Sequence, residues 1–156
     1  MTNAVGTVTS NEVTLTVNPL PAITTQPSST TVNQGSQASF SVVATNAVSY
    51  QWQMNNGTGW VNFVAGTGST SASLTTAPAS AVANGFKFRV AVTNAVGTVT
   101  SNEVTLTVNP LPAITTQPSN TTVNEGAMAS FSVVATNAVS YQWQMNNGTG
   151  LSLIHI

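Results

Sequence analysis

Few side chains in this sequence could carry out acid–base or nucleophilic chemistry. The 156 residues include no cysteine and no aspartate. General acid–base catalysis needs a pair of carboxylates, or a histidine close to a nucleophile. The single histidine, His155, lies in the last residues, which depart from the pattern of the rest of the chain. The charged residues are two bases and three acids: Lys87, Arg89, Glu12, Glu103 and Glu125. We therefore predict that the protein is not an enzyme.

The same composition argues against metals, cofactors and nucleic acids. Zinc sites need clustered cysteine and histidine, and calcium sites need several carboxylate oxygens, which the predicted linker at 109–112 does not supply. Binding to nucleic acid needs a stripe of basic residues, and the chain has only two bases. No apolar run is long enough to cross a membrane. We expect no cofactor, no metal, no nucleic-acid partner and no membrane insertion for this chain.

Three side chains are candidates for binding. Trp60 follows a predicted hairpin loop and could stack on a sugar ring or on an apolar patch of a partner. Lys87 and Arg89 share the outward face of one predicted strand and could contact an anionic glycan. Each has a simpler structural explanation, because such a tryptophan commonly holds its loop against the sheet and two bases commonly form a solvated face.

The elements that would position these side chains belong to a repeated unit. Residues 2–59 recur as residues 93–150 with a period of 91. The two copies differ at four positions: Ser29/Asn120, Gln34/Glu125, Ser36/Ala127 and Gln37/Met128. A period of about 90 residues matches a complete small domain and is longer than one unit of a solenoid or propeller, so we expect a tandem array of domains.

This period predicts the domain boundaries. We expect 19–109 to be one complete domain, 1–18 to be the last strands of a preceding unit, and 110–150 to be the first strands of a following one. The repeat stops at Gly150, and we interpret 151–156 as a non-native tail.

Strand signals follow one another through the complete copy. Apolar and polar residues alternate over 38–44, 48–54 and 86–92, which is typical of half-buried strands. The apolar parity changes between Val99 and Val104, which predicts a β-bulge near Asn102. No segment has a helical pattern. The sequence therefore predicts an all-β protein with an antiparallel sandwich of two sheets.

The spacing of particular residues within these strands resembles a known family. The pattern consists of Gly35, Phe40, Val42, Tyr50, Gln51, Trp52, Leu74, residues 88–94 and Gly97. It resembles bacterial immunoglobulin-like, I-set-related domains that lack cysteine, with fibronectin type III as the rival sandwich. The resemblance implies that Val42 and Val90 stand where other immunoglobulin-like domains have the two cysteines of their disulfide, so that apolar packing replaces the bridge. It also implies that Trp52 is the core tryptophan and that Phe88 occupies the tyrosine-corner position.

The strand pattern and the resemblance together predict the structural core and the function. The predicted core residues are Phe40, Val42, Tyr50, Trp52, Leu74, Phe88, Val90 and Val92. The expected function is that of a noncatalytic spacer or adhesin-type repeat in a large bacterial protein that is secreted or anchored at the cell surface. The alternative is a module that binds a carbohydrate or a protein through hairpin loops and a sheet edge. The expected partners are neighbouring repeats and, for the alternative, a surface glycan or protein.

Overall fold

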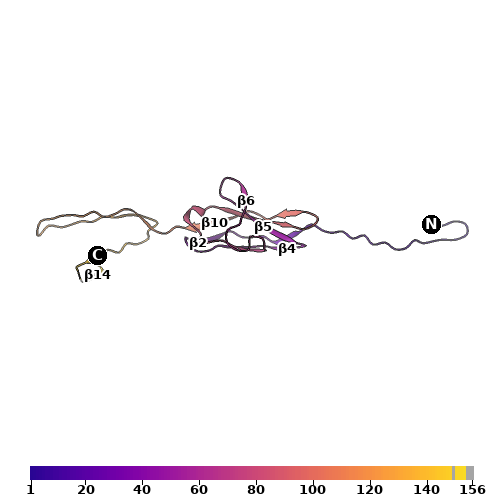
Figure 1. Ribbon diagram of the computed structural model, residues 1–156, viewed down its shortest axis with the longest axis horizontal. Helices are drawn as coiled ribbons and strands as arrows, with labels where there is room; N and C mark the ends of the chain where they lie inside the picture. Colours follow the sequence, from indigo (N-terminus) through magenta and orange to yellow (C-terminus); the bar gives the residue numbers. More distant parts are fainter. Residues whose placement is uncertain (149, 154–156) are drawn as a thin grey trace.

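β-Strands make up almost all the regular structure of the computed structural model, which describes residues 1–148 and 150–153. The molecule is elongated (Figure 1). An extended N-terminal segment leads into a central sandwich, and the residues after it continue from the opposite end of that sandwich. The two termini therefore lie at opposite ends of the molecule.

One layer of the sandwich consists of two short antiparallel pairs. Strand β1 (Ala22–Thr25) pairs with β4 (Val43–Thr45), and β3 (Ser39–Ser41) pairs with β7 (Ser73–Thr75). The N–H of Val42 donates to Ala72 O between these pairs, at 3.0 Å. The alternating segment 38–44 therefore contributes to both pairs, although the sequence predicts it as one continuous strand.

The other layer is a six-stranded sheet in the order β2-β10-β8-β5-β6, with β9 also pairing with β8. Its strands are β2 (Thr30–Asn33), β5 (Ser49–Asn55), β6 (Trp60–Asn62), β8 (Lys87–Thr93), β9 (Thr98–Thr100) and β10 (Val104–Asn109). All pairs are antiparallel except β2 with β10, which is parallel. This strand order confirms the predicted immunoglobulin-like fold class.

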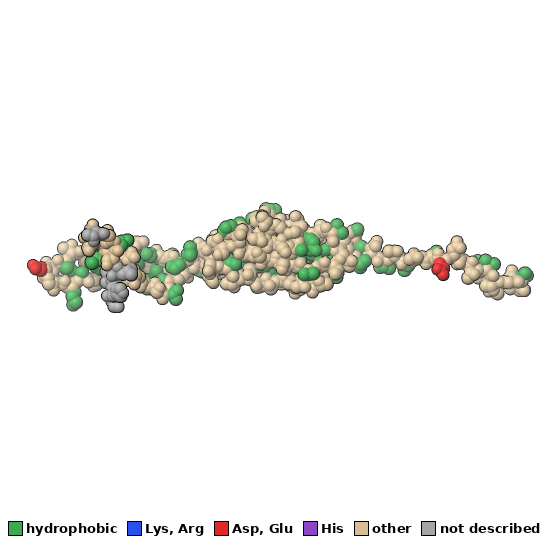
Figure 2. Space-filling model, turned by 90° about the horizontal axis from the view of Figure 1, so that it is seen from below, with side chains coloured by type: hydrophobic (Ala, Val, Ile, Leu, Met, Phe, Trp, Pro, Cys, Tyr) green, Lys and Arg blue, Asp and Glu red, His purple; other side chains and the backbone are tan. Residues whose placement is uncertain are grey.

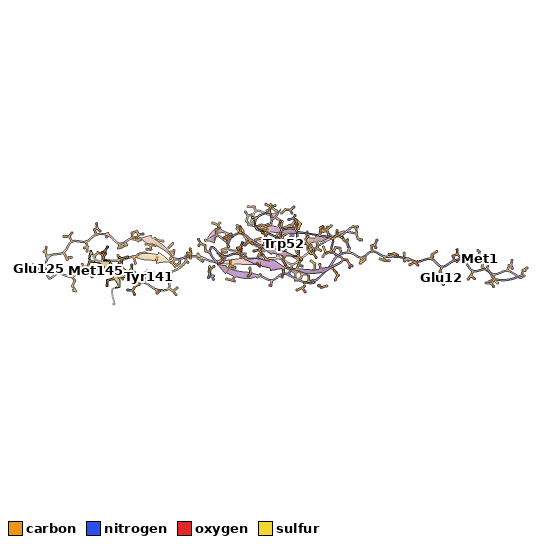
Figure 3. The ribbon with its side chains drawn as sticks, turned by 60° about the horizontal axis from the view of Figure 1, so that its bottom comes forward. Met1, Glu12, Trp52, Glu125, Tyr141 and Met145 are labelled. Carbon is orange, nitrogen blue, oxygen red and sulfur yellow. The ribbon has the colours of Figure 1, made fainter. Side chains whose placement is uncertain are left out.

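The core lies between the two layers, and the buried hydrophobic residues of its cluster come from 38–108. They are Ala38, Phe40, Val42, Trp52, Phe63, Leu74, Ala79, Phe88, Val90, Val92, Val104, Leu106 and Val108. The ring of Phe88 stacks on Phe40 at 4.8 Å between centroids and meets Phe63 edge-on at 5.3 Å. Trp52 lies in the middle of the sandwich and has no exposed surface (Figure 3). Aromatic rings and branched aliphatic side chains thus fill the space between the two layers.

Three apolar side chains of the alternating segment 48–54 are less buried than their pattern indicates, and one of them, Met54, is only partly buried against the core. Tyr50 is half-buried and packs against the edge of the core. Val48 is 79% exposed, because it lies in the turn before β5. That turn begins at Asn46, which adopts a φ of 55°, a left-handed conformation that asparagine tolerates better than most residues. The apolar pattern therefore begins before the strand enters the sandwich.

The structure contains two elements for which the sequence shows no pattern. β2 is polar, and it is a strand because β10, far along the chain, pairs with it through four residues. A single 3₁₀ turn, η1 (Ala81–Ala83), leads into Gly85 and β8. The bulge predicted near Asn102 agrees with the structure, since β9 and β10 both pair with β8 and their registers differ by one residue.

The two terminal segments form only those pairs for which they hold both strands. β11 (Ala113–Thr116) pairs with β12 (Val134–Thr136) in the register of β1 with β4. β13 (Gln144–Asn146) pairs with β14 (Leu151–Leu153) in the register of β5 with β6. The predicted foreign tail begins with β14, and the rest of it, including His155, lies outside the described residues. Among residues 1–18 the structure describes one isolated bridge, between Thr2 and Thr7.

Candidate functional site

The three candidate binding residues lie on the outer face of the six-stranded sheet. Trp60 pairs with Asn55, and Asn55 pairs with Lys87, so these side chains project from the same face of β6, β5 and β8. Arg89 lies on that face as well, two residues along β8. Strand pairing therefore places Trp60 on the same face as Lys87 and Arg89, although it lies far from them in the sequence.

Arg89 is at the centre of a small polar cluster. Its guanidinium carbon lies 4.1 Å from the centroid of a Trp60 ring. Its Nε donates to Gln53 Oε1 at 2.9 Å, and Gln53 Nε2 donates to Asn62 Oδ1 at 3.2 Å. We call these four residues the Trp60–Arg89 cluster. It holds the indole against the sheet, and Trp60 is accordingly partly buried.

Lys87 is engaged elsewhere on the face. Its Nζ lies 3.1 Å from Glu103 Oε2, and the two side chains are 52% and 47% exposed. An ion pair this exposed contributes about 0–1 kcal/mol to stability. The structure thus places Lys87 with Glu103 and not with the indole.

Two asparagine side chains order the hairpin loop before Trp60. The Oδ1 of Asn56 accepts both the N–H and the hydroxyl of Thr58, at 3.2 and 2.6 Å. Asn55 Oδ1 accepts the N–H groups of Gly57 and Gly59, at 2.8 and 3.1 Å. Both glycines have positive φ, which lets the short loop close without strain. These hydrogen bonds restrict the loop, so Trp60, which follows it, has a defined position on the outer face.

We predict a small, measurable coupling between Trp60 and Arg89. A cation–π contact at a partly exposed site contributes about 0.5–1 kcal/mol. A double-mutant cycle of Trp60→Ala and Arg89→Ala, read out by urea unfolding, should give a coupling energy of that size. The pair Trp60→Ala and Lys87→Ala is the matched control and should show none. Equal coupling in the two cycles would contradict the geometry described here.

A second candidate site is the junction at which the chain enters the sandwich. Asn94, in the turn after β8, donates from Nδ2 to the carbonyl oxygens of Pro19 at 2.8 Å and Asn46 at 3.0 Å. Its Oδ1 accepts the N–H groups of Val96 and Gly97. One side-chain amide therefore ties the entering linker to two turns of the sandwich.

The junction at the opposite end is held from both sides. Gln34 Oε1 accepts the N–H of Leu111 at 3.2 Å, and the N–H of Gln34 donates to Asn109 O at 2.9 Å. Beyond the junction, Asn137 Nδ2 donates to Leu111 O at 3.4 Å. The leaving linker is thus hydrogen bonded to the sandwich and to the segment that follows it.

Sequence reasoning overlooked Asn94 and Gln34, although it contained a signal for each. Asn94 begins a turn that recurs at Asn3, whose Oδ1 accepts the N–H groups of Val5 and Gly6 in the same way. Gln34 is one of the four positions at which the copies differ, with Glu125 as its counterpart. A carboxylate keeps the acceptor but adds a charge and loses the donor. The copies therefore differ at the residue that holds the leaving linker.

The described residues contain no group of three or more His, Cys, Asp and Glu side chains that could hold a metal ion. Over the same part of the chain, no helix is both long enough and apolar enough to span a membrane.

Comparison with known proteins gives one sequence relative and several structural neighbours. No protein-family profile matches the chain. The chain is similar to endoglucanase C of Cellulomonas fimi, with 33% identity over 135 residues, which are 83% of this chain but 12% of that protein. The chain thus spans about an eighth of the length of this relative.

The structural neighbours are immunoglobulin domains. They include a chimeric titin Z1Z2 (TM-score 0.46, 22% identity, 62% of this chain and 100% of that chain) and immunoglobulin domains 1–5 of Sidekick-1 (TM-score 0.48, 23% identity, 61% and 21%). Titin Z1Z2 in complex with telethonin is a further neighbour (TM-score 0.46, 20% identity, 78% and 65%). The fold assignment made above depends on the strand pairing and not on these scores.

Proposed function

We propose that this chain is a noncatalytic spacer, formed by tandem immunoglobulin-like units in a large secreted or surface-anchored bacterial protein. One observation carries the proposal: the chain enters and leaves the sandwich at opposite ends, and side-chain hydrogen bonds hold both linkers. Units built this way would follow one another in an extended line, because each linker has a fixed orientation relative to the sandwich. Such a spacer would hold a neighbouring domain at a distance from the cell surface, or from the substrate of another domain of the same protein.

Composition and similarity support this proposal. The described residues include five charged side chains. The two that lie close together, Lys87 and Glu103, are a base and an acid in an exposed ion pair, and not the pair of carboxylates that acid–base catalysis needs. An extracellular location is supported by the similarity to a protein that its name describes as an endoglucanase. The chain matches a small part of that protein, as expected if it is an accessory region of a larger molecule.

We predict that the extended shape does not depend on metal ions. Proline-containing linkers and the amides of Asn94 and Gln34 determine the geometry, and the described residues contain no carboxylate cluster that could hold a metal ion. Small-angle scattering of the full chain, at low concentration, should give the same radius of gyration with EDTA and with added calcium. A clear compaction on chelation would overturn the spacer geometry proposed here.

A second candidate function is carbohydrate binding, and the Trp60–Arg89 cluster favours it. An indole with a guanidinium and two amides beside it offers a stacking surface and hydrogen-bonding groups, which are the groups that sugar rings need. The name of the sequence relative suggests glucan as the first ligand to test.

Affinity electrophoresis of the full chain in gels with soluble β-glucan separates the two proposals. The spacer proposal predicts the same mobility with and without glucan. The binding proposal predicts a retardation that Trp60→Ala abolishes and that Val61→Ala, a change at a neighbouring exposed residue, leaves in place. Retardation that both variants retain would rule out the Trp60–Arg89 cluster as the binding site. Release of reducing sugar by the purified chain would contradict both proposals.

A further inference from the structure

The hairpin loop before Trp60 contains an asparagine followed by a glycine, a pair that is prone to spontaneous ring closure. Glycine has no side chain to obstruct attack by its own backbone nitrogen on the amide of the asparagine. The complete sandwich contains two such pairs, Asn56–Gly57 and Asn84–Gly85. Both asparagines are exposed, so exposure does not distinguish the two pairs, whereas their hydrogen bonds do.

The pair Asn84–Gly85 is held by β10. The N–H of Val108 donates to Asn84 Oδ1 at 2.9 Å, and the N–H of Gly85 donates to Leu106 O at 2.9 Å. Both reacting groups of this pair, the side-chain amide and the glycine nitrogen, are therefore bonded to a strand whose apolar side chains lie in the core. The ring can close here only when the turn separates from the sheet, and such an opening costs free energy.

The hydrogen bonds of Asn56–Gly57 stay within their own loop. The N–H of Gly57 donates to Asn55 Oδ1 at 2.8 Å, and Asn56 Oδ1 accepts the hydroxyl and the N–H of Thr58, at 2.6 and 3.2 Å. A local movement of the exposed residues 56–59 can therefore bring the glycine nitrogen to the side chain while the sandwich stays folded. The two donors of Thr58 are bonded to the oxygen on which negative charge develops during the attack, and they stabilise that charge.

We propose that Asn56 is a site of spontaneous deamidation, which Thr58 promotes. The nitrogen of Gly57 attacks Cγ of Asn56 and gives up its proton, the bond from Cγ to Nδ2 breaks, and Nδ2 leaves as ammonia. Water then opens the resulting succinimide ring at one of its two carbonyl groups, which leaves aspartate or isoaspartate at position 56. The reaction needs only water, and no atom is oxidised or reduced.

The product changes both the charge and the backbone of the loop. One carboxylate is added to a chain with a formal net charge of −1, on a sandwich whose surface in Figure 2 is mostly tan, the colour of uncharged polar side chains and backbone. Asn56 and Lys87 line the same open pocket of about 400 Å³, so the new charge would lie near that base. Isoaspartate also lengthens the main chain of the loop that positions Trp60. The reaction would therefore alter the outer face with time, whether or not that face binds a carbohydrate.

Peptide mass spectrometry of the full chain tests the proposal. Chymotryptic peptides that end at Trp60 and at Phe86 report the two pairs separately, and the same pair in the next copy, Asn147–Gly148, gives a different mass because Leu151 takes the place of Trp60. In the folded protein, deamidation at Asn56 should be about tenfold faster than at Asn84, or more. In concentrated guanidinium chloride the two rates should be equal, because the unfolded chain presents the same dipeptide at both places.

Two results of this comparison would overturn the proposal. Equal rates at Asn56 and Asn84 in the folded protein would show that the hydrogen bonds to β10 give no protection. A difference that persists in guanidinium chloride would assign the selectivity to neighbouring residues in the sequence and not to the fold.

Substitution of Thr58 tests its part in the reaction. Thr58→Val removes the hydroxyl and should slow deamidation of Asn56 in the folded protein by about threefold or more. Thr58→Ser keeps a hydroxyl and should retain the original rate. Asn84 is the internal reference, and its rate should be the same in both variants. An unchanged or faster reaction at Asn56 in Thr58→Val would mean that Thr58 only restrains the loop, and would contradict the promotion proposed here.

Discussion

Replacing Trp52 by alanine should lower the free energy of unfolding by about 3–5 kcal/mol. The side chain has no exposed surface, it pairs across the sheet with Val90, and its ring lies 6.1 Å from that of Phe40. Its Nε1 donates to Ser71 O at 2.9 Å, so the truncation also removes the partner of a carbonyl group. Since small domains unfold at a cost of about 5–15 kcal/mol, the loss would be a large part of the total.

The measurement is urea unfolding of the full chain at micromolar concentration, followed by circular dichroism. Trp60→Ala is the matched control, because it removes the same side chain from the outer face and should cost about 1 kcal/mol or less. Trp52→Phe separates the two contributions: it keeps much of the volume but leaves the Ser71 carbonyl without its donor, at a cost of about 1–3 kcal/mol. If Trp52→Ala cost no more than Trp60→Ala, the assignment of the core would be wrong.

Replacing Gly66 by alanine should destabilise the sandwich by about 3 kcal/mol. Gly66 has a φ of +89°, and a left-handed conformation costs an alanine about 1–2 kcal/mol. A Cβ at this position would also clash with Thr75 O and come within 2.9 Å of Thr76 Cα. These are backbone atoms, so relief requires a shift of the adjoining bridge between Thr67 and Thr75, and overpacking of this kind costs about 1–3 kcal/mol more.

Gly85→Ala is the control for Gly66→Ala. Gly85 has nearly the same φ, +86°, but a Cβ there would have nothing within 4 Å. Only the conformational cost applies, and the variant should lose about 1–2 kcal/mol. The difference between the two variants in urea unfolding measures the clash alone. Equal losses would show that the loop around Gly66 adjusts freely, and would contradict its close packing on β7.

Val42 and Val90 are buried in the core of a sandwich that has no disulfide. The resemblance places these two valines at the cysteine positions, and they are 3% and 0% exposed in the core. With no cysteine in the chain, no covalent link restrains the unfolded state. Stability therefore depends on apolar packing, to which Trp52 and the close contacts of β7 contribute directly.

The candidate site shows how far sequence reasoning reached. Alternation along β8 placed Lys87 and Arg89 on the outward face, because side chains two residues apart share a face of a strand. That Arg89 meets Trp60 while Lys87 meets Glu103 depends on which strands are neighbours and in which register. Pairing across the sheet joins residues far apart in sequence, and no local pattern contains it. The linker contacts of Asn94 and Gln34 also join residues far apart in sequence, so the turn pattern and the copy difference indicated the two positions but not their partners.

The sequence by itself determined the class of fold, the faces of β5 and β8, and the scarcity of catalytic groups, because alternation and composition are local properties. Only the tertiary structure decided which polar segments become strands. Thr30–Asn33 form β2, whereas the identical residues 121–124 form no strand. The two segments have the same four residues, and the one that forms a strand has β10 paired with it. A strand's hydrogen-bonding groups are satisfied by its neighbour, so a short polar segment becomes a strand only where tertiary contacts provide that neighbour.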